Sequence, residues 1–415
     1  MKTLKRHPLI HSLLTARGNP KAGMFTEPLW GIPFNLYAPF ASVYMLALGL
    51  TERTIGLIAT VGLALQIVTT ILGGPITDKL GRKRATFIFD TISWSIPTLL
   101  WAFAQDEIWF YAAAIVNSML RITMTSWTCL FIEDAPANKV VHFWTWVHVA
   151  GIVAGFVTPV AGLLIERFEL IPTMRIIYLF AFVSMTAKFI ILNAIATETR
   201  QGHVRLRETA DRSLWSLVAE LIRDIPRVFR SPGTVVAIAL LAVNAIYITI
   251  RGTFFSVLLA EGLSFTAREI GLFPALRSFV ILAFFFLVIP RLDPERHVGY
   301  LSAGIVLTIG SLVLLVIAPV RGVALVTVST IIEAVGAALL APYIESFVTA
   351  IVDPHHRARI LAVANTVVLA VATPFGWIAG VLSEAGKTLP FVLSGFVFVL
   401  ALLVLLVLNP ERLRR

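Results

Sequence analysis

The sequence predicts an all-α integral membrane protein with twelve transmembrane helices in two six-helix bundles. Of the 415 residues, 58% are hydrophobic and 14% are charged, whereas soluble domains contain about 25% charged residues. Apolar runs of the ~20 residues needed to cross a bilayer recur along the whole chain. The longest polar interval lies near the middle of the chain and separates six runs from six.

The apolar runs lack polar–apolar alternation, so helices rather than a barrel are expected to satisfy the backbone. The predicted spans are 28–49, 55–77, 86–105, 108–132, 143–165, 174–195, 234–258, 268–290, 298–318, 323–350, 358–382 and 388–408. The predicted domains are an N-terminal segment 1–27, a first bundle 28–195, a linker 196–233, a second bundle 234–408 and a tail 409–415. No cleavable signal peptide is expected before the first span.

Basic residues gather on one side of these spans. The side that holds both termini contains 24 of the 34 Lys and Arg residues, and the opposite loops contain 6. This bias predicts a multi-pass protein of the cell (inner or plasma) membrane with both termini cytoplasmic. It also explains the net charge of +10. Because the charges are spread over seven segments, they do not indicate a nucleic-acid partner.

The linker contains one amphipathic stretch. Leu214, Leu217, Val218, Leu221 and Ile225 fall on one face of a helix. That helix is predicted either to lie on the inner membrane surface or to join the two bundles as a soluble linker helix.

The chain lacks the motifs of an enzyme or an ATP-driven pump. Its single cysteine, Cys129, excludes an internal disulfide and a cysteine-based metal site. The letters GKT at 386–388 are not the end of a Walker sequence, because Val381 stands where glycine is required. No His-Glu metal motif or Gly-x-Ser-x-Gly motif occurs, so neither catalysis nor a cofactor is expected. A channel or receptor would differ from a transporter in showing no proton-linked accumulation of a solute.

The polar stretch "GGPITDKLGRKR" at 73–84 separates the second and third spans. Gly74 permits a close helix approach and Gly81 a tight turn. Asp78 is expected to accept hydrogen bonds from the N-terminus of a neighbouring helix. Arg82 is expected to bridge to a carboxylate.

This stretch resembles the signature loop of the major facilitator superfamily, in sequence and in position. The matching residues are Gly74, Asp78, Lys79, Gly81, Arg82 and Lys83, whereas Ile76 and Thr77 depart from the common pattern. The resemblance implies that fold, a monomer, and secondary active transport by alternating access. It also implies that Asp78 and Arg82, with Glu133 or Asp134 as acidic partner, lock the two halves together in the outward-open state.

Ionisable residues inside the spans are costly and are therefore candidates for function. They are Asp90, Arg121, Lys188, Arg251, Arg277, Glu333 and Glu345. Asp90 and Glu345 lie near the cytoplasmic ends of their spans, where they are expected to reach the interface or the signature-loop network. For Lys188, a functional and a structural role both stay open.

Arg121 is a candidate for coupling or substrate binding. "NSMLRITMT" resembles the arginine motif of the family's fourth span, which is associated with proton-coupled transport, although Met124 and Thr125 replace the usual Gln-Gly. A structural ion pair is the alternative. Glu333 is interpreted either as a proton carrier or as the counter-charge of Arg251 or Arg277.

Polar and aromatic side chains in the first and seventh spans are candidates for lining a cavity. They are Asn35, Tyr37 and Tyr44 in the first span, and Asn244 and Tyr247 in the seventh. Helix packing is the alternative interpretation.

The predicted function is secondary transport of a small organic solute, with a proton as coupling ion and the lipid bilayer as surroundings. Efflux of amphiphilic drug-like compounds is favoured by the aromatic content and by Gly155 and Pro159, which loosely resemble the family's antiporter motif. Transport of an anionic, sugar or lipid-linked solute is the alternative, since four basic residues lie within the spans against three acidic ones.

Overall fold

The computed structural model describes residues 8–222, 232–292, 297–351 and 357–408, and the side chains of 11–219, 235–292, 298–344 and 363–406. Every regular element in these ranges is a helix. The first half contains α1 (Pro8–Leu14), α2 (Gly18–Thr26), α3 (Pro28–Tyr37), α4 (Ala41–Ala47), α5 (Glu52–Leu80), α6 (Arg82–Asp90), α7 (Ile96–Ala102), α8 (Glu107–Asn117), α9 (Leu120–Ile132), α10 (Val140–Ala154), α11 (Thr158–Phe168) and α12 (Leu170–Ile195). The linker contains α13 (Arg200–Glu208) and α14 (Leu214–Ile222), and the second half contains α16 (Pro232–Val257), α17 (Ala267–Leu287), α18 (His297–Val316), α19 (Val323–Ile351), α20 (Arg357–Ala385) and α21 (Leu389–Leu408).

Ten helices within the described ranges are long and apolar enough to cross a membrane, and they coincide with ten of the predicted spans. The first and third predicted spans are also helical, over 28–47 and 82–102. These two spans contain polar residues such as Asn35 and Asp90, and they are not among the ten long apolar helices. A π-helical segment, Thr91–Ser95, follows Asp90 and joins α6 to α7. The all-α membrane fold is confirmed, and twelve spans are consistent with it.

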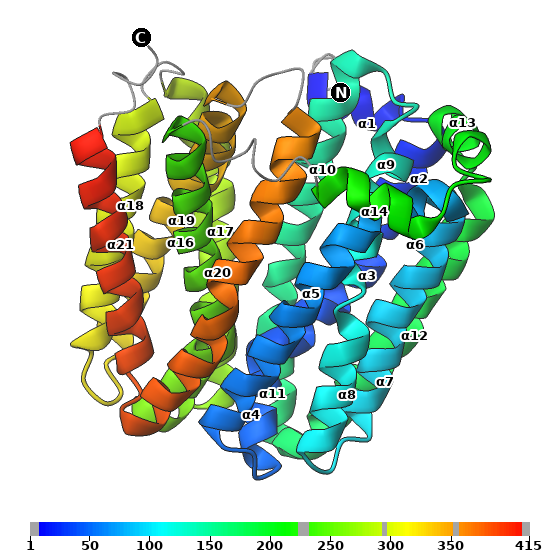
Figure 1. Cartoon of the computed structure of the whole chain (residues 1–415). Helices are drawn as coiled ribbons and strands as arrows, with labels where there is room; N and C mark the ends of the chain where they lie inside the picture. Colours follow the sequence, from blue (N-terminus) through cyan, green and yellow to red (C-terminus); the bar gives the residue numbers. More distant parts are fainter. Residues whose placement is uncertain (1–7, 223–231, 293–296, 352–356, 409–415) are drawn as a thin grey trace.

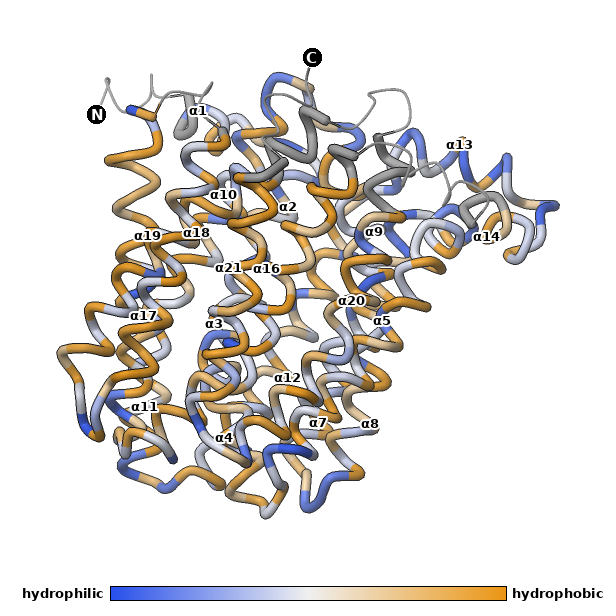
Figure 2. Tube along the Cα trace, turned by 60° about the vertical axis from the view of Figure 1, so that its left-hand side comes forward, coloured by the Kyte–Doolittle hydropathy of each residue, from blue (hydrophilic) through white to orange (hydrophobic). Residues whose placement is uncertain are grey.

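The helices form two bundles, one from α3 to α12 and one from α16 to α21 (Figure 1). The start of α1 and the end of α21 lie at the same end of the molecule, together with α13 and α14. We call this end the terminal side and the opposite end the far side. Hydrophobic residues cover the long helices, whereas hydrophilic residues gather on α13 and in the far-side loops (Figure 2).

The bundles meet through glycines on the far side. A Cβ on Gly56 of α5 would collide with the carbonyl oxygen of Gly376 on α20. A Cβ on Gly162 of α11 would lie 2.5 Å from the carbonyl oxygen of Ala267 on α17. Thr60 donates a hydrogen bond across the first contact to the Thr373 carbonyl at 2.9 Å. Glu384 accepts from the backbone N–H of Arg53, the backbone N–H of Trp377 donates to Thr60, and Lys387 pairs with Glu52, all on this side.

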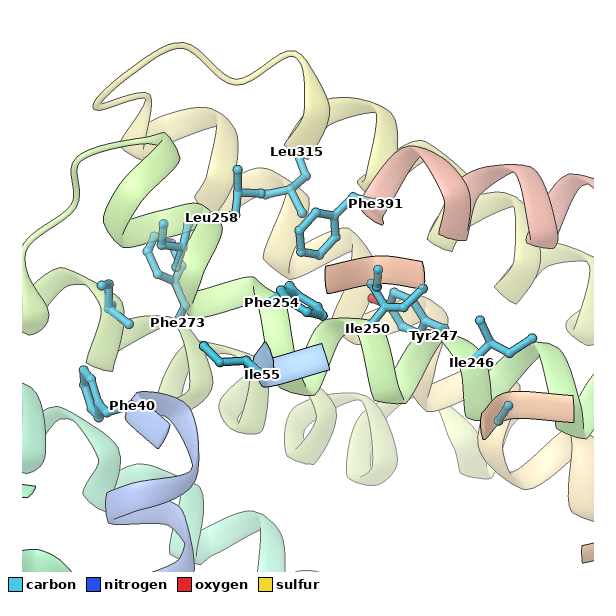
Figure 3. Close-up of a cluster of buried hydrophobic side chains, with 14 of the residues drawn as sticks. Phe40, Ile55, Ile246, Tyr247, Ile250, Phe254, Leu258, Phe273, Leu315 and Phe391 are labelled. Atoms are coloured by element: carbon cyan, nitrogen blue, oxygen red, sulfur yellow. The ribbon is translucent and has the colours of Figure 1, made fainter. Parts of the chain in front are cut away.

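One hydrophobic core runs through both bundles. Phe254 and Leu258 of α16 lie near Leu315 and Phe391 of the second bundle, and Ile55 of α5 lies on the opposite side of α16 (Figure 3). The far-side contact is therefore continuous with the interior of each half.

The linker packs against the first bundle. Leu217 and Val218 of α14 are buried, and α14 contacts α5. Trp215 on another face is 73% exposed. An amphipathic helix therefore exists where the sequence predicted one, while the predicted face continues to Leu221 and Ile225, whose side chains lie outside the described residues.

Candidate functional site

The signature-loop cluster is built around the buried side chain of Arg82, which joins two acidic residues. Its Nη1 lies 3.0 Å from Asp78 Oδ1, and its Nε lies 3.0 Å from Glu133 Oε2. Nη2 donates a further bond to Glu133 Oε1 at 3.1 Å. This forked geometry is the strong mode of arginine–carboxylate pairing. Of the two acidic residues proposed at the end of the fourth span, Glu133 is the one that contacts Arg82.

The linker closes over this cluster. Arg205 of α13 lies 2.7 Å from Asp78 Oδ2, and Thr199 donates to Glu133 Oε2 at 2.5 Å. Asp134 accepts from the backbone N–H of Arg200 at 3.3 Å. The hydrogen bond to Asp78 is the main cause that raises the pKa of Arg205 above its ordinary value, so this side chain stays charged. We call Glu198, Thr199 and Arg205 the linker clasp.

The role expected for Asp78 was wrong in one respect. Its carboxylate accepts from Arg82 and Arg205 side chains rather than from the N-terminus of a helix. Glu198 takes that position instead, accepting from the backbone N–H groups of Arg82 and Lys83 at 3.0 and 3.1 Å. An anion at the start of α6 is favoured by the helix dipole.

The two signature glycines differ. Gly81 has φ +82°, and a Cβ there would lie 2.5 Å from Glu198, so the tight turn requires glycine. The close helix approach expected at Gly74 is absent from this conformation, because a Cβ there would meet nothing within 4 Å. Its neighbour Gly73 makes the approach, since a Cβ there would lie 2.9 Å from Thr125 Oγ1 on α9.

The second bundle contains a buried cluster of opposite charges around Glu333 of α19. Glu333 Oε2 lies 2.8 Å from Arg277 Nε and 3.3 Å from Arg251 Nη2, and Oε1 accepts from the Tyr247 hydroxyl at 3.1 Å. The Glu333 side chain is only 2% exposed, whereas that of Arg277 is 35% exposed. Of the two interpretations of Glu333, the structure places it as the counter-charge of both arginines.

The cluster has more positive than negative charge. Asn244, Tyr247 and Arg251 lie three and four residues apart on α16 and so share one face. Two guanidinium groups face one carboxylate, and the side chain of Arg277 is only partly buried. Asn244 is half-buried and makes no hydrogen bond among the described residues. The five residues predicted for this bundle thus occupy neighbouring helices, although no contact places Asn244 against the other four.

Arg121 in the first bundle has no carboxylate partner. It is the second residue of α9, shortly after the break between α8 and α9. Its Nε donates to Gln66 Oε1 of α5 at 2.8 Å. Nη1 lies 3.6 Å from Met124 Sδ. No carboxylate among the described residues lies within ion-pair distance of Arg121, so the structural ion pair is not found there.

Lys188 does have a counter-charge. Its Nζ lies 2.9 Å from Glu27 Oε2, and it stands over the Trp30 and Trp127 rings at 5.7 and 5.9 Å from their centroids. Asp90 is buried in the same bundle. The side chain of Glu345 lies outside the described residues.

The first-span candidates separate into two groups. Asn35 donates to the Gly31 carbonyl and Tyr44 to the Trp101 carbonyl, so both complete helix packing. Tyr37 lines a cavity of about 280 Å³ between α3, α4, α5, α7, α8, α12 and α16, which also reaches Gln66 and Thr249. Its ring is buried, and its hydroxyl has no hydrogen-bond partner among the described residues.

Sequence reasoning missed several partners of these residues. Glu27, Glu198 and Arg205 fall outside the apolar runs, so they were assigned to the aqueous segments. Gln66 is neutral and therefore escaped a search for charged residues. It was nevertheless detectable as the one side-chain amide in the second span.

The fold and these clusters define a class of protein. Two helical bundles that meet on one side, with charged residues buried inside each, are the architecture of an alternating-access membrane transporter. The family model described as Major Facilitator Superfamily matches residues 29–296. The chain belongs to this superfamily and is a transporter rather than an enzyme.

Solved structures agree with the fold. A POT family transporter in complex with 5-aminolevulinic acid has 17% identity and a TM-score of 0.72, with coverage of 94% of this chain and 96% of the other. The nucleoside transporter NupG has 16% identity and a TM-score of 0.70, with coverage of 94% and 99%. The human organic anion transporter MFSD10 (TETRAN) has 15% identity and a TM-score of 0.65, with coverage of 93% and 98%. The comparison with curated protein sequences gave no match.

Proposed function

We propose that this protein is a monomeric secondary active transporter of a small organic anion. The observation that supports it is positive charge without a matching carboxylate beside it: two arginines share one carboxylate in the second bundle, and Arg121 of the first bundle has no carboxylate within ion-pair distance among the described residues. Glu333 offsets only one of two arginines, Arg277 remains one-third exposed, and Arg121 has no carboxylate partner. A guanidinium fork binds carboxylates and phosphates better than other groups. An organic anion transporter among the structural neighbours is consistent with this substrate class.

The proposed mechanism is alternating access across the cell membrane, with the terminal side cytoplasmic. Since the bundle contacts lie on the far side, this conformation corresponds to the state that faces the cytoplasm. The signature-loop cluster is proposed to contact the second bundle only in the opposite state. In the present state the residues of the linker clasp contact the acidic side chains of this cluster instead.

A proton is proposed as the coupling ion. Asp90 is a carboxylate buried in the first bundle, and membrane-buried carboxylates form proton relays in transporters. Drug efflux, which the sequence favoured, is a second candidate supported by the aromatic lining of the cavity around Tyr37.

The experiment is a thermal-shift screen of the purified protein with organic anions, cationic amphiphiles and sugars at two pH values. A ligand that binds the folded state raises the melting temperature in a concentration-dependent way. Organic anions are expected to do so in the wild type, with affinity at least about tenfold weaker in Arg277→Gln. Arg268→Gln, an exposed arginine on the same helix, is the matched control. A shift by cationic amphiphiles alone would overturn the anion proposal in favour of efflux.

A further inference from the structure

Asp90, the last residue of α6, is a carboxylate buried in the first bundle without a counter-charge of its own. It is 4% exposed and forms no ion pair among the described residues. The nearby Lys188 ammonium pairs instead with Glu27, at 2.9 Å. A buried carboxylate that lacks a counter-charge costs much free energy, and binding a proton removes the charge. Asp90 is therefore a candidate proton site.

One lysine faces two carboxylates in this region. The charges that act on Asp90 come from Lys188 on α12 and from Glu27 between α2 and α3. Helix α9 contributes the uncharged Thr123 hydroxyl, and among the described residues α5 adds no charge to this set. With both carboxylates ionised the cluster carries one excess negative charge, whereas one bound proton makes it neutral. Excess charge is costly inside a membrane, so the neutral cluster is favoured there.

The surroundings of Lys188 stabilise an ammonium ion. Its Nζ lies over the rings of Trp30 and Trp127, at 5.7 and 5.9 Å from their centroids, and the face of an aromatic ring attracts a cation. The ion pair with Glu27 adds to this attraction. Since Lys188 and Glu27 neutralise each other, Asp90 is the member of the cluster that can gain or lose a proton.

A small cavity extends from Asp90 along α6. Its volume is about 10 Å³, and its lining includes Lys83, Thr86 and Asp90 of α6 and Asn193 of α12. A space of about this volume holds one water molecule when two to four polar groups can bond to it. These four side chains supply such groups. Lys83 follows the signature-loop turn on the terminal side and is half-buried, so water in this cavity lies between Asp90 and that side.

The backbone is irregular directly after Asp90. The π-helical segment Thr91–Ser95 begins at the next residue, and such segments are frequent at functional sites. Within it, the Ser93 carbonyl accepts a hydrogen bond from the Asn117 side chain at 2.6 Å. Asn117 also lines the cavity around Tyr37. The segment that follows Asp90 thus contacts a residue of the cavity that both bundles line.

We propose that Asp90 binds a proton and exchanges it with the terminal side through the small cavity, while Lys188 and Glu27 remain a charged pair. This inference rests on the proposed proton coupling and assigns the proton to one residue. On release, the O–H bond of the Asp90 carboxyl group breaks, the proton passes to water in the cavity, and the electron pair stays on the carboxylate. The competing assignment, in which Asp90 is a permanently charged second partner of Lys188, predicts the opposite results below.

The test is infrared difference spectroscopy of the protein in lipid nanodiscs, between weakly acidic and alkaline buffer. Exposed carboxylates stay ionised over this range, so the C=O band of a protonated carboxyl group reports a buried one. We expect such a band in the wild type at weakly acidic pH, its loss at alkaline pH, and its absence from Asp90→Asn. Glu166→Gln removes an exposed carboxylate on α11 and should keep the band. A band that persists in Asp90→Asn would overturn the assignment.

Two further measurements keep the inference testable. In the wild type, the band should shift when water is replaced by deuterated water, since the cavity gives Asp90 access to solvent, and an unshifted band would overturn the exchange path. In alkaline buffer, Asp90→Asn should melt at a higher temperature than the wild type, because it lacks the buried charge. A lower melting temperature would show that Asp90 is a structural counter-charge. No measurement uses a substrate, so failure here leaves anion transport standing, and absence of anion transport leaves the proton site standing.

Discussion

At the scale of single residues, the Glu333 carboxylate stabilises the fold by neutralising part of the positive charge of two arginines. The remaining positive charge is available to bind a substrate. The Glu333 carboxylate lies against Arg251, Arg277 and Tyr247. Removing one partner from a buried ion pair leaves the other charge uncompensated, which costs more than the pair contributes. We therefore expect Glu333→Gln to lower the free energy of unfolding by about 3 kcal/mol, toward the low end of measured values because Arg277 is partly exposed.

Thermal unfolding with and without an organic anion checks this prediction. An added anion should recover more stability in Glu333→Gln than in the wild type, because it replaces the missing counter-charge. Glu166→Gln changes an exposed carboxylate on α11 and serves as control, with an expected effect within about 0.5 kcal/mol. A Glu333→Gln variant as stable as the wild type would contradict the role of Glu333 as counter-charge.

The sequence predicted which residues are unusual at this scale, but not their partners. Arg251, Arg277 and Glu333 could be identified because charge in an apolar run is costly. Their pairing depends on how α16, α17 and α19 pack, which no spacing along the chain reveals. Glu27 was not considered as the partner of Lys188, because it precedes the apolar run and α2 and α3 carry it into the first bundle.

At the scale of helices, glycines determine where the bundles meet. A side chain at Gly56 would strike α20, so Gly56→Val is expected to disfavour this conformation and to open the far side. Gly310→Val on α18 is the matched control, since a Cβ there meets nothing within 4 Å. Labelling of a cysteine introduced into the cavity, for example Ala59→Cys in a Cys129→Ser background, reports access from each side. Unchanged far-side labelling in Gly56→Val would contradict the prediction.

The linker clasp is the second helix-scale feature that favours this state. Arg205 binds Asp78, whereas the exposed Arg207 on the same helix forms no ion pair with an acidic side chain among the described residues. Arg205→Gln should release Asp78 and increase far-side labelling about twofold to tenfold, the ratio for a ~0.5–1.4 kcal/mol shift. Arg207→Gln should leave labelling unchanged, and equal effects of the two substitutions would show that general linker charge, rather than the clasp, is responsible.

Helix positions were predictable because each span must supply about 20 apolar residues. Helix contacts were not. The signature motif indicated Gly74 as a point of close approach, yet α9 meets α5 at Gly73 in this state. A sequence motif includes the requirements of every state in the transport cycle, whereas one structure shows the contacts of one state.

At the scale of the whole molecule, the positive charge on the terminal side predicts its orientation. A membrane-impermeant thiol reagent applied to intact cells should label Glu107→Cys on the far side and should not label Ser213→Cys on the terminal side, both in the Cys129→Ser background. Permeabilised cells provide the control, since both positions should then react. The reverse pattern would contradict cytoplasmic termini.

The fold class was predictable at this scale because composition and span number limit the architecture to two bundles. The substrate was not, because aromatic content favoured amphiphiles while the basic residues favoured anions. Only the packing shows that one carboxylate is shared between Arg251 and Arg277 and that Arg121 has none.

The most direct test of the central claim is solute counterflow in proteoliposomes, which requires no knowledge of the coupling ion. Vesicles are loaded with an unlabelled organic anion that binds in the thermal-shift screen, and are diluted into a trace of the same compound carrying a label. The proposed function predicts transient accumulation of label, abolished by Arg277→Gln and retained in Arg268→Gln. Absence of accumulation with this and other organic anions, while a cationic amphiphile does show counterflow, would contradict it.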